Sequence, residues 1–115
     1  MKKIFFVGIG GIGMSGLARL LKAKGAEVCG SDVAASSITE ELRSEGIAVS
    51  IGHRMENLPE DADLVVYSEA IPPENIDLQG ANSREIPTLT YFQALGEFTR
   101  DYQLVAIAGT HGKTT

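Results

Sequence analysis

The chain has 115 residues, a formal net charge of −5, 43% hydrophobic residues and 22% charged residues. These values are ordinary for a single soluble globular domain, and no apolar stretch approaches the ~18 residues that would suggest a membrane span. Nucleic-acid surfaces need clustered Lys and Arg, whereas the ten basic residues of this acidic chain are scattered. We therefore expect one compact domain that binds neither nucleic acid nor membrane.

The first predicted element is a strand that runs into a glycine-rich turn. Residues 4–7 are all apolar, and Gly8, Gly10 and Gly13 then match the pattern G-x-G-x-x-G. Such glycines allow a tight turn, close approach of the backbone to a phosphate, and packing of helix on strand. The N–H groups at the helix start face the ligand, and the helix dipole adds about half a positive charge there. The stretch predicts a site for an anion, such as a diphosphate.

A helix and a second strand follow the glycine turn. Met14, Leu17, Ala18 and Leu21 recur at helical spacing, and Gly25 is a typical stop signal. Residues 27–30 then predict a short strand, so the segment forms a βαβ unit with parallel strands. The lone cysteine, at position 29 in this strand, is expected to be a buried and inert thiol in a reducing cytoplasm.

Ser31 and Asp32 stand at the end of the second strand. Asp32 lies nineteen residues after Gly13, where an acidic residue usually binds a ribose hydroxyl in dinucleotide-binding folds. The alternative is that Asp32 only caps the turn that follows, since Asp favours turns. Both interpretations place the residue at the ligand edge of the sheet.

The middle of the chain predicts a helix, a strand and a polar loop. Ser37 and Glu40 fit a capping box that begins a helix, which ends at Gly46. Residues 47–51 predict a third strand, and His53 lies in the loop that leaves it. Ligands of open α/β sheets bind at this carboxyl edge, so His53 is a candidate contact, with a solvated loop histidine as the alternative.

A fourth strand is predicted over residues 63–68, nearly all apolar as in a parallel strand buried on both faces. Its polar end, Ser68 and Glu69, again emerges at the ligand edge. Residues 72–82 predict a loop or short helix, and residues 88–89 a short segment. Thr90 and Gln93 then fit a second capping box, which begins a helix that is expected to turn Phe92, Leu95 and Phe98 inward.

The last predicted strand, residues 104–108, leads into a second phosphate motif. Gly112, Lys113 and Thr114 match the working end of a P-loop, in which Lys113 reaches the β and γ phosphates and the Thr114 hydroxyl binds Mg²⁺. The match is partial, because Ile107 stands where the full pattern has its first glycine. A P-loop must also lead into a helix, and no residue remains to form one. We expect 109–115 to be a poorly ordered tail in an excised fragment that binds ATP weakly or not at all, which titration calorimetry with Mg-ATP would check.

Together these motifs resemble the Mur ligase family over the whole chain. The resemblance rests on the glycine stretch 6–16, the Gly30-Ser31-Asp32 turn, the His53 loop, residues 68–71, and the ending Gly109-Thr110-His111-Gly112-Lys113-Thr114-Thr115. The ending is a shortened P-loop of the kind that this family uses. Glu69 and the Pro72-Pro73 pair depart from the family's usual pattern, which concerns the detail of the uracil pocket.

The resemblance implies a fold, a domain organisation and an activity. The fold is α/β and Rossmann-like, a mostly parallel sheet of about five strands with helices on both faces. Residues 1–108 are the UDP-substrate-binding domain, and 109–115 begin the central ATPase domain of a cytoplasmic peptidoglycan-synthesis enzyme. In this enzyme ATP and Mg²⁺ phosphorylate the lactyl carboxylate of UDP-N-acetylmuramate, and the amine of L-alanine attacks the acyl phosphate. The fragment alone is expected to be inactive and to hold no cofactor.

The resemblance also assigns site residues. The UDP moiety is assigned to Gly8, Gly10, Gly11, Ile12, Gly13, Ser31, Asp32, His53, Ser68 and Ala70, and ATP to Gly109, Thr110, His111, Gly112, Lys113, Thr114 and Thr115. Three alternatives stay open. They are a related ligase that attaches a recycled tripeptide, an NAD-dependent oxidoreductase domain, and a nucleotide-sensing regulatory domain. The last two leave the P-loop-like ending unexplained.

Overall fold

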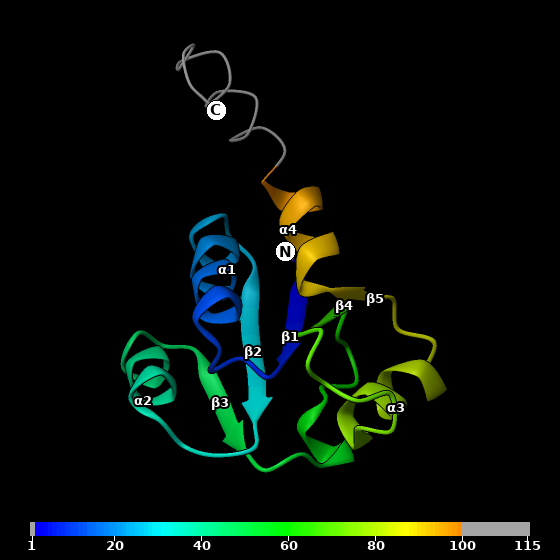
Figure 1. Ribbon diagram of the computed structural model, residues 1–115. Helices are drawn as coiled ribbons and strands as arrows, with labels where there is room; N and C mark the ends of the chain where they lie inside the picture. The colour runs from blue at the N-terminus through cyan, green and yellow to red at the C-terminus, as the bar shows by residue number, and fades with distance from the viewer. Residues whose placement is uncertain (1, 100–115) are drawn as a thin grey trace.

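The computed structural model describes residues 2–99, and the sheet at its centre is entirely parallel (Figure 1). Its strands lie in the order β3-β2-β1-β4-β5. They span Lys3–Val7 (β1), Glu27–Asp32 (β2), Ala48–Ile51 (β3), Leu64–Tyr67 (β4) and Thr88–Thr90 (β5). The helices are α1 (Ile12–Ala23), α2 (Ser37–Ser44), α3 (Ile76–Ser83) and α4 (Tyr91–Phe98), with a 3-10 helix η1 (Met55–Asn57). The Rossmann-like α/β prediction is confirmed.

Helices cover both faces of the sheet, and β1 shows how the sequence divides the core. Ile4 and Phe6 belong to a cluster with buried residues of α1, α2 and α4, whereas Phe5 and Val7 belong to a second cluster with Ala81 of α3. This division follows from the alternation of side chains along a strand. After Lys3, the central strand β1 is therefore apolar at every position from Ile4 to Val7, as buried parallel strands usually are.

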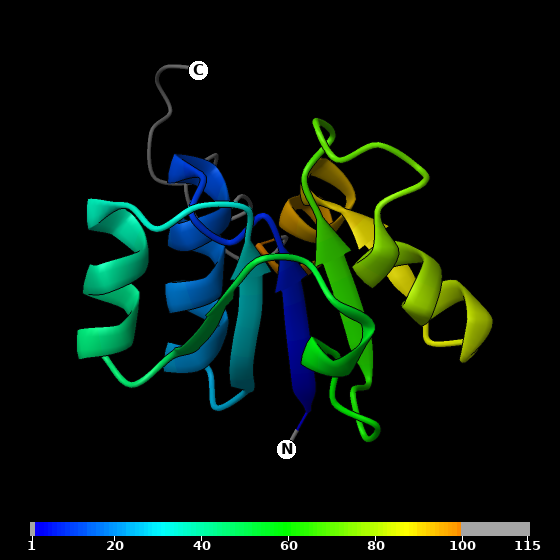
Figure 2. The same cartoon turned by 90° about the horizontal axis from the view of Figure 1, so that it is seen from below.

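The strand order creates a switch point between β1 and β4. The chain adds β2 and β3 on one side of β1 and then crosses to β4 on the other side, as both cartoon views show (Figure 2). Ligands of open α/β sheets bind in the crevice at the carboxyl ends of the two strands that flank such a point. The topology therefore places a binding crevice next to the glycine turn that follows β1.

The capping box predicted for α4 is confirmed, and the one predicted for α2 is displaced by one residue. Thr90 and Gln93 form the predicted capping box of α4. At α2, however, the capping box joins Ser36 and Thr39, not Ser37 and Glu40. The hydroxyl oxygen of the fully buried Thr39 accepts the Ser36 N–H over 2.8 Å. The predicted capping box at Ser37 was therefore wrong by one position.

The buried face of α4 also differs from the prediction. Leu95 and Phe98 pack against the core, but Phe92 is 67% exposed. Tyr91 and the fully buried Ala94 take the inward positions, because the spacing 91, 94, 95 and 98 forms one helical stripe that leaves residue 92 outside. Residues 88–90 form the fifth strand of the described sheet, and the strand predicted over 104–108 lies outside the described residues. Among residues 2–99, no helix is long and apolar enough to cross a membrane.

Cys29 lies in β2, where burial raises the pKa of its thiol to about 11. Only the thiolate attacks alkylating reagents, so iodoacetamide at pH 7.5 should modify the folded chain about a hundredfold more slowly than the urea-unfolded chain. The unfolded thiol, with a pKa of about 8.5, loses its proton first as the pH rises. The free energy of unfolding should therefore fall between about pH 8.5 and pH 11. Equal alkylation rates in the two states would contradict this description.

Candidate functional site

The glycine turn after β1 is attached firmly to β2. The N–H groups of Gly8 and Ile9 both donate to the Ser31 carbonyl, over 2.9 and 3.0 Å. Gly8 has a φ of +86°, a left-handed conformation that side chains rarely adopt, so this position favours glycine. The turn ends at Gly11, which is the N-cap residue of α1.

Three N–H groups at the start of α1 have no partner within the helix. The first N–H that donates within it belongs to Ser15, which bonds to the Gly11 carbonyl over 2.8 Å. Those of Ile12, Gly13 and Met14 therefore lack an intrahelical acceptor, as in the first turn of any helix. The first turn carries no acidic residue, and no side chain caps it. The α1 start can thus receive an anion.

A pocket of about 200 Å³ lies beside this helix start. Its lining comes from the glycine turn, from α1, from the end of β4 and from α4, with Gly8, Gly11, Gly13, Met14, Ser68, Glu69 and Tyr91. A side chain at position 13 would place its Cβ 2.8 Å from the Tyr91 ring. Gly13 therefore allows Tyr91 of α4 to lie against the helix start. Its predicted role in packing helix on strand stays a prediction.

Asp32 holds the glycine turn in place. One carboxylate oxygen accepts the Gly10 N–H over 2.8 Å, and the other accepts the Val33 N–H over 2.8 Å. The turn-capping alternative is thus observed, together with a longer-range bond that the sequence did not predict. The Gly10 N–H serves this bond, and the Gly11 N–H donates to the Gly8 carbonyl over 3.3 Å. The donors that remain for an anion are those further along, at residues 12–14. Contact of Asp32 with a ribose stays a prediction.

Ser68 and Ala70 lie where the sequence placed them, at the carboxyl end of β4. Ser68 lines the pocket, and its hydroxyl accepts the Ala70 N–H over 3.1 Å. Glu69, which departs from the family's usual pattern, accepts the Phe92 N–H over 3.4 Å and so links this loop to the start of α4. The turns after β1 and β4 are therefore brought to one pocket.

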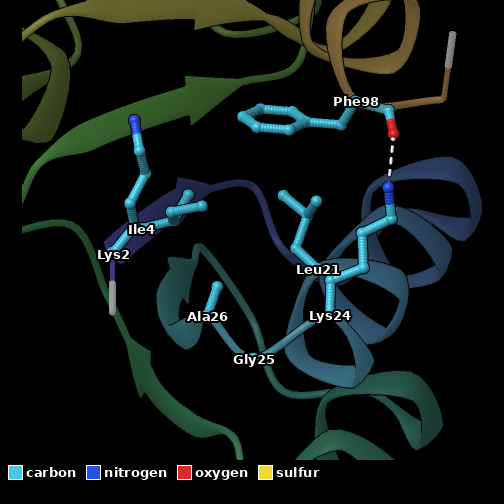
Figure 3. Close-up of a pocket in the computed structure, with 7 residues that line it drawn as sticks. All are labelled: Lys2, Ile4, Leu21, Lys24, Gly25, Ala26 and Phe98. Carbon is cyan, nitrogen blue, oxygen red and sulfur yellow. Dashed lines mark hydrogen bonds between the residues drawn. The ribbon is translucent and has the colours of Figure 1, made fainter.

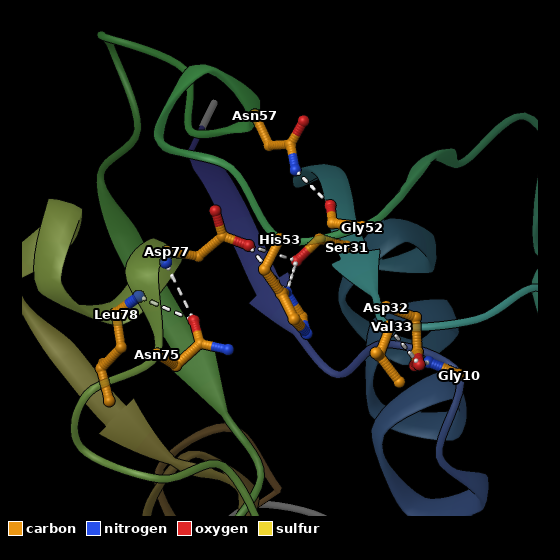
Figure 4. A network of polar contacts seen from close by, with 10 residues as sticks. All are labelled: Gly10, Ser31, Asp32, Val33, Gly52, His53, Asn57, Asn75, Asp77 and Leu78. Carbon is orange, nitrogen blue, oxygen red and sulfur yellow. Dashed lines mark hydrogen bonds and ion pairs between the residues drawn. The ribbon is translucent and has the colours of Figure 1, made fainter.

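His53 and Ser31 meet a third residue that the sequence did not single out. Asp77, in the first turn of α3, lies with Oδ2 2.8 Å from Ser31 Oγ and 2.9 Å from His53 Nδ1 (Figure 4). Ser31 and Asp77 are fully buried, whereas the His53 side chain is 17% exposed. The predicted contact of Ser31 with a ligand stays a prediction, since its hydroxyl here donates to Asp77.

A second pocket, of about 220 Å³, lies at the opposite, amino-terminal edge of the sheet (Figure 3). It is lined mainly by apolar side chains, including Ile4, Leu21 and Phe98. Lys24 at its rim donates to the Phe98 carbonyl over 2.9 Å and thereby ties the end of α1 to the end of α4. In the described part of the chain, the helices contribute only their carboxyl ends to this pocket, at Leu21 and the C-cap residue Lys24 of α1 and at Phe98 of α4. We therefore place the candidate site at the carboxyl edge of the sheet.

The predicted ATP-binding residues, Gly109 to Thr115, lie outside the described residues, and so does Thr114 as the Mg²⁺ ligand. Within residues 2–99, no group of three or more His, Cys, Asp or Glu side chains could hold a metal ion. The assignments of Lys113 and Thr114 therefore stay predictions.

Fold and site define a doubly wound α/β domain whose switch point presents the uncapped start of α1. A family model described as the catalytic domain of the Mur ligase family matches residues 3–103, and the chain belongs to this family. The resemblance drawn from the sequence is thereby confirmed.

Relatives and solved structures support the same family. The UDP-N-acetylmuramate–L-alanine ligase of Carboxydothermus hydrogenoformans is 48% identical over all 115 residues, which cover 25% of that protein. The crystal structure of UDP-N-acetylmuramate-alanine ligase from Thermotoga maritima has a TM-score of 0.80 and 32% identity, over 91% of this chain and 23% of that one. A murein peptide ligase from Psychrobacter arcticus has a TM-score of 0.81 and 25% identity, over 88% and 21%. The chain thus spans about a quarter of the length of the curated relatives it matches.

Proposed function

We propose that residues 1–108 are the UDP-N-acetylmuramate-binding domain of a cytoplasmic, ATP-dependent ligase that adds L-alanine to this substrate in peptidoglycan synthesis. Residues 109–115 would begin its central ATPase domain. The proposal is supported by family membership and by relatives of 45–50% identity that carry this activity in their names.

The observation that carries the proposal is the α1 start at the β1–β4 switch point. Its N–H groups at Ile12, Gly13 and Met14 lack helical partners, and no acidic residue stands in this turn. A diphosphate matches this arrangement, because several phosphate oxygens can accept from adjacent N–H groups while the helix dipole favours their charge. The domain would hold the UDP end and leave the lactyl carboxylate free for chemistry in another domain.

The reaction itself would use residues beyond those described. ATP would supply the phosphoryl group that activates the substrate carboxylate, with Lys113 reaching the phosphates and Thr114 binding Mg²⁺. The amine of L-alanine would then displace phosphate and form the amide. Residues 2–99 would bind and orient the UDP-sugar substrate, and residues outside this range would carry out the reaction.

Thermal shifts with three ligands test the binding proposal. UDP and UDP-N-acetylmuramate should stabilise the chain, by about 2.7 kcal/mol at a concentration a hundredfold above Kd, whereas NADH should not. The comparison is informative because the glycine pattern and Asp32 also occur in NAD-dependent oxidoreductase domains. Stabilisation by NADH together with no response to the two UDP compounds would overturn the proposal.

The similarity to a murein peptide ligase keeps one alternative open within the family. That activity would attach a recycled tripeptide to the same UDP-sugar. ATP-dependent phosphate release by the whole protein, measured with L-alanine and with the tripeptide, separates the two. We expect release with L-alanine, and a requirement for the tripeptide would favour the alternative.

A further inference from the structure

Ser31, His53 and Asp77 form a triangle of polar groups beneath the ligand edge. Asp77 Oδ2 lies 2.8 Å from Ser31 Oγ and 2.9 Å from His53 Nδ1, and Oγ and Nδ1 are 3.1 Å apart. Three elements meet here. Ser31 lies near the end of β2, His53 lies in the loop after β3, and Asp77 lies in the first turn of α3. Residues that are distant in sequence are thus held together by one carboxylate oxygen.

The backbone on both sides of the triangle is fixed. The Asn75 side chain accepts the Asp77 and Leu78 N–H groups over 2.9 and 3.2 Å, which sets the start of α3 (Figure 4). On the other side, the Gly52 N–H donates to the Asp32 carbonyl over 2.7 Å, and Asn57 donates to the Gly52 carbonyl over 2.8 Å. His53 therefore meets Asp77 between two anchored segments.

The contacts of Nδ1 bear on where the neutral imidazole carries its proton. A carboxylate at Asp77 only accepts hydrogen bonds, and in that arrangement both Ser31 Oγ–H and His53 Nδ1–H donate to Asp77 Oδ2. The neutral ring then carries its proton on Nδ1 and leaves Nε2 as an acceptor. Figure 4 shows the far edge of the ring pointing away from Ser31 and Asp77.

The same contacts exclude a nucleophilic triad. A serine nucleophile must be accessible and must give its proton to the histidine, which in turn donates to the carboxylate. Here Ser31 is fully buried and its hydroxyl donates to Asp77. A function in orienting His53 fits the geometry, whereas acyl transfer does not.

We propose that Asp77 is a positioning residue that fixes the Nδ1–H tautomer of His53, so that Nε2 accepts a hydrogen bond from an O–H or N–H group of the nucleoside part of the ligand. Asp77 lies in the first turn of α3, where the helix dipole is positive. The inference rests on the proposed function for the identity of the ligand, but the tautomer can be measured without any ligand.

Long-range ¹H–¹⁵N correlation spectra of the histidine rings test the proposal. The chain has two histidines, so His53→Gln assigns the signals. In the unchanged chain, the neutral His53 ring should carry its proton on Nδ1, and the Nε2 signal should move on addition of UDP but not of inorganic pyrophosphate. Asp77→Ala should lose the Nδ1–H preference and weaken UDP binding about tenfold, the typical effect of one hydrogen bond.

Two further variants separate positioning from general stability. Ser31→Ala should retain the Nδ1–H tautomer, because the bond from His53 to Asp77 remains. Asp61→Asn removes a carboxylate that pairs with Lys3 at the surface, 3.0 Å away, and should change neither the tautomer nor the binding of UDP.

A ring protonated on Nε2 in the unchanged chain would overturn the inference, even if Asp77→Ala fails to fold. Retention of both tautomer and affinity in Asp77→Ala would also overturn it. If the unchanged chain does not bind UDP at all, the proposed function fails, and the spectrum of the unliganded chain still decides whether Asp77 fixes the ring.

Discussion

Replacing Ile12 with aspartate should weaken binding of UDP and UDP-N-acetylmuramate on the order of a hundredfold without destabilising the fold. Ile12 is 85% exposed, so its loss costs little burial, and an acidic side chain in the first helical turn adds about 0.3–1 kcal/mol of stability. The same carboxylate repels a diphosphate held by the adjacent N–H groups. Two unit charges 4 Å apart interact by about 4 kcal/mol at an effective dielectric of about 20. Allowing for solvent screening, we expect a loss of affinity on the order of a hundredfold, measured by calorimetry.

Ile12→Asn is the matched control for this experiment. It has nearly the shape of the aspartate variant but no charge, so it should bind the UDP ligands within a few-fold of the unchanged chain. Equal affinity of the aspartate variant and the unchanged chain would place the diphosphate away from the α1 start.

Gly30→Ala should have the largest effect on stability. Gly30 lies in β2 and pairs with Phe6, and an added Cβ would lie 2.5 Å from the Phe6 carbonyl oxygen and 2.7 Å from Ile9 Cδ1. The first contact is with the backbone of the central strand, which cannot move without disturbing pairing on both of its sides. We expect a loss of about 3 kcal/mol and a fall in Tm of more than 10 °C, in the upper range for overpacking.

Gly16→Ala should raise the Tm, in contrast to the fall expected for Gly30→Ala. An added Cβ at Gly16 meets no atom within 4 Å, and the residue lies on the exposed side of α1. Alanine is favoured over glycine in a helix by up to about 1 kcal/mol, so the Tm should rise by several degrees. Similar destabilisation by the two variants would show that the packing around Gly30 is not the cause.

Local patterns predicted the first half of the fold well. The apolar run of β1, the spacing of Met14, Leu17, Ala18 and Leu21, and the stop at Gly25 each depend on neighbours along the chain. The structure buries all four helix residues and gives Gly25 a φ of +101°. These elements could therefore be found from residue order alone.

Elements that depend on tertiary contacts were harder to predict. The strand β5 has only three residues, all half-buried, and within residues 2–99 it pairs with β4 alone, so it has no periodicity to detect. Adjacent serines at 36 and 37 each have a possible capping partner three residues later, and burial of Thr39 decides between them. Phe92 was placed inward because it is apolar, although Tyr91 lies on the buried stripe.

The candidate site likewise contains one part that local sequence predicts and one part that depends on tertiary contacts. The glycine pattern predicted the helix start, because its chemistry is contained in one continuous stretch. Asp77 carried no local signal beyond a polar residue near a helix start. Its importance arises only when the ends of β2 and β3 are brought beside α3.

The most direct test of the central claim is a titration of the ¹⁵N-labelled chain with UDP-N-acetylmuramate, followed by backbone amide shifts. We predict that the largest changes occur at Ile12, Gly13 and Met14, the N–H groups proposed to hold the diphosphate, and that uridine without phosphates leaves them nearly unchanged. Changes confined to the amino-terminal edge of the sheet, around Leu21, Lys24 and Phe98, would contradict it.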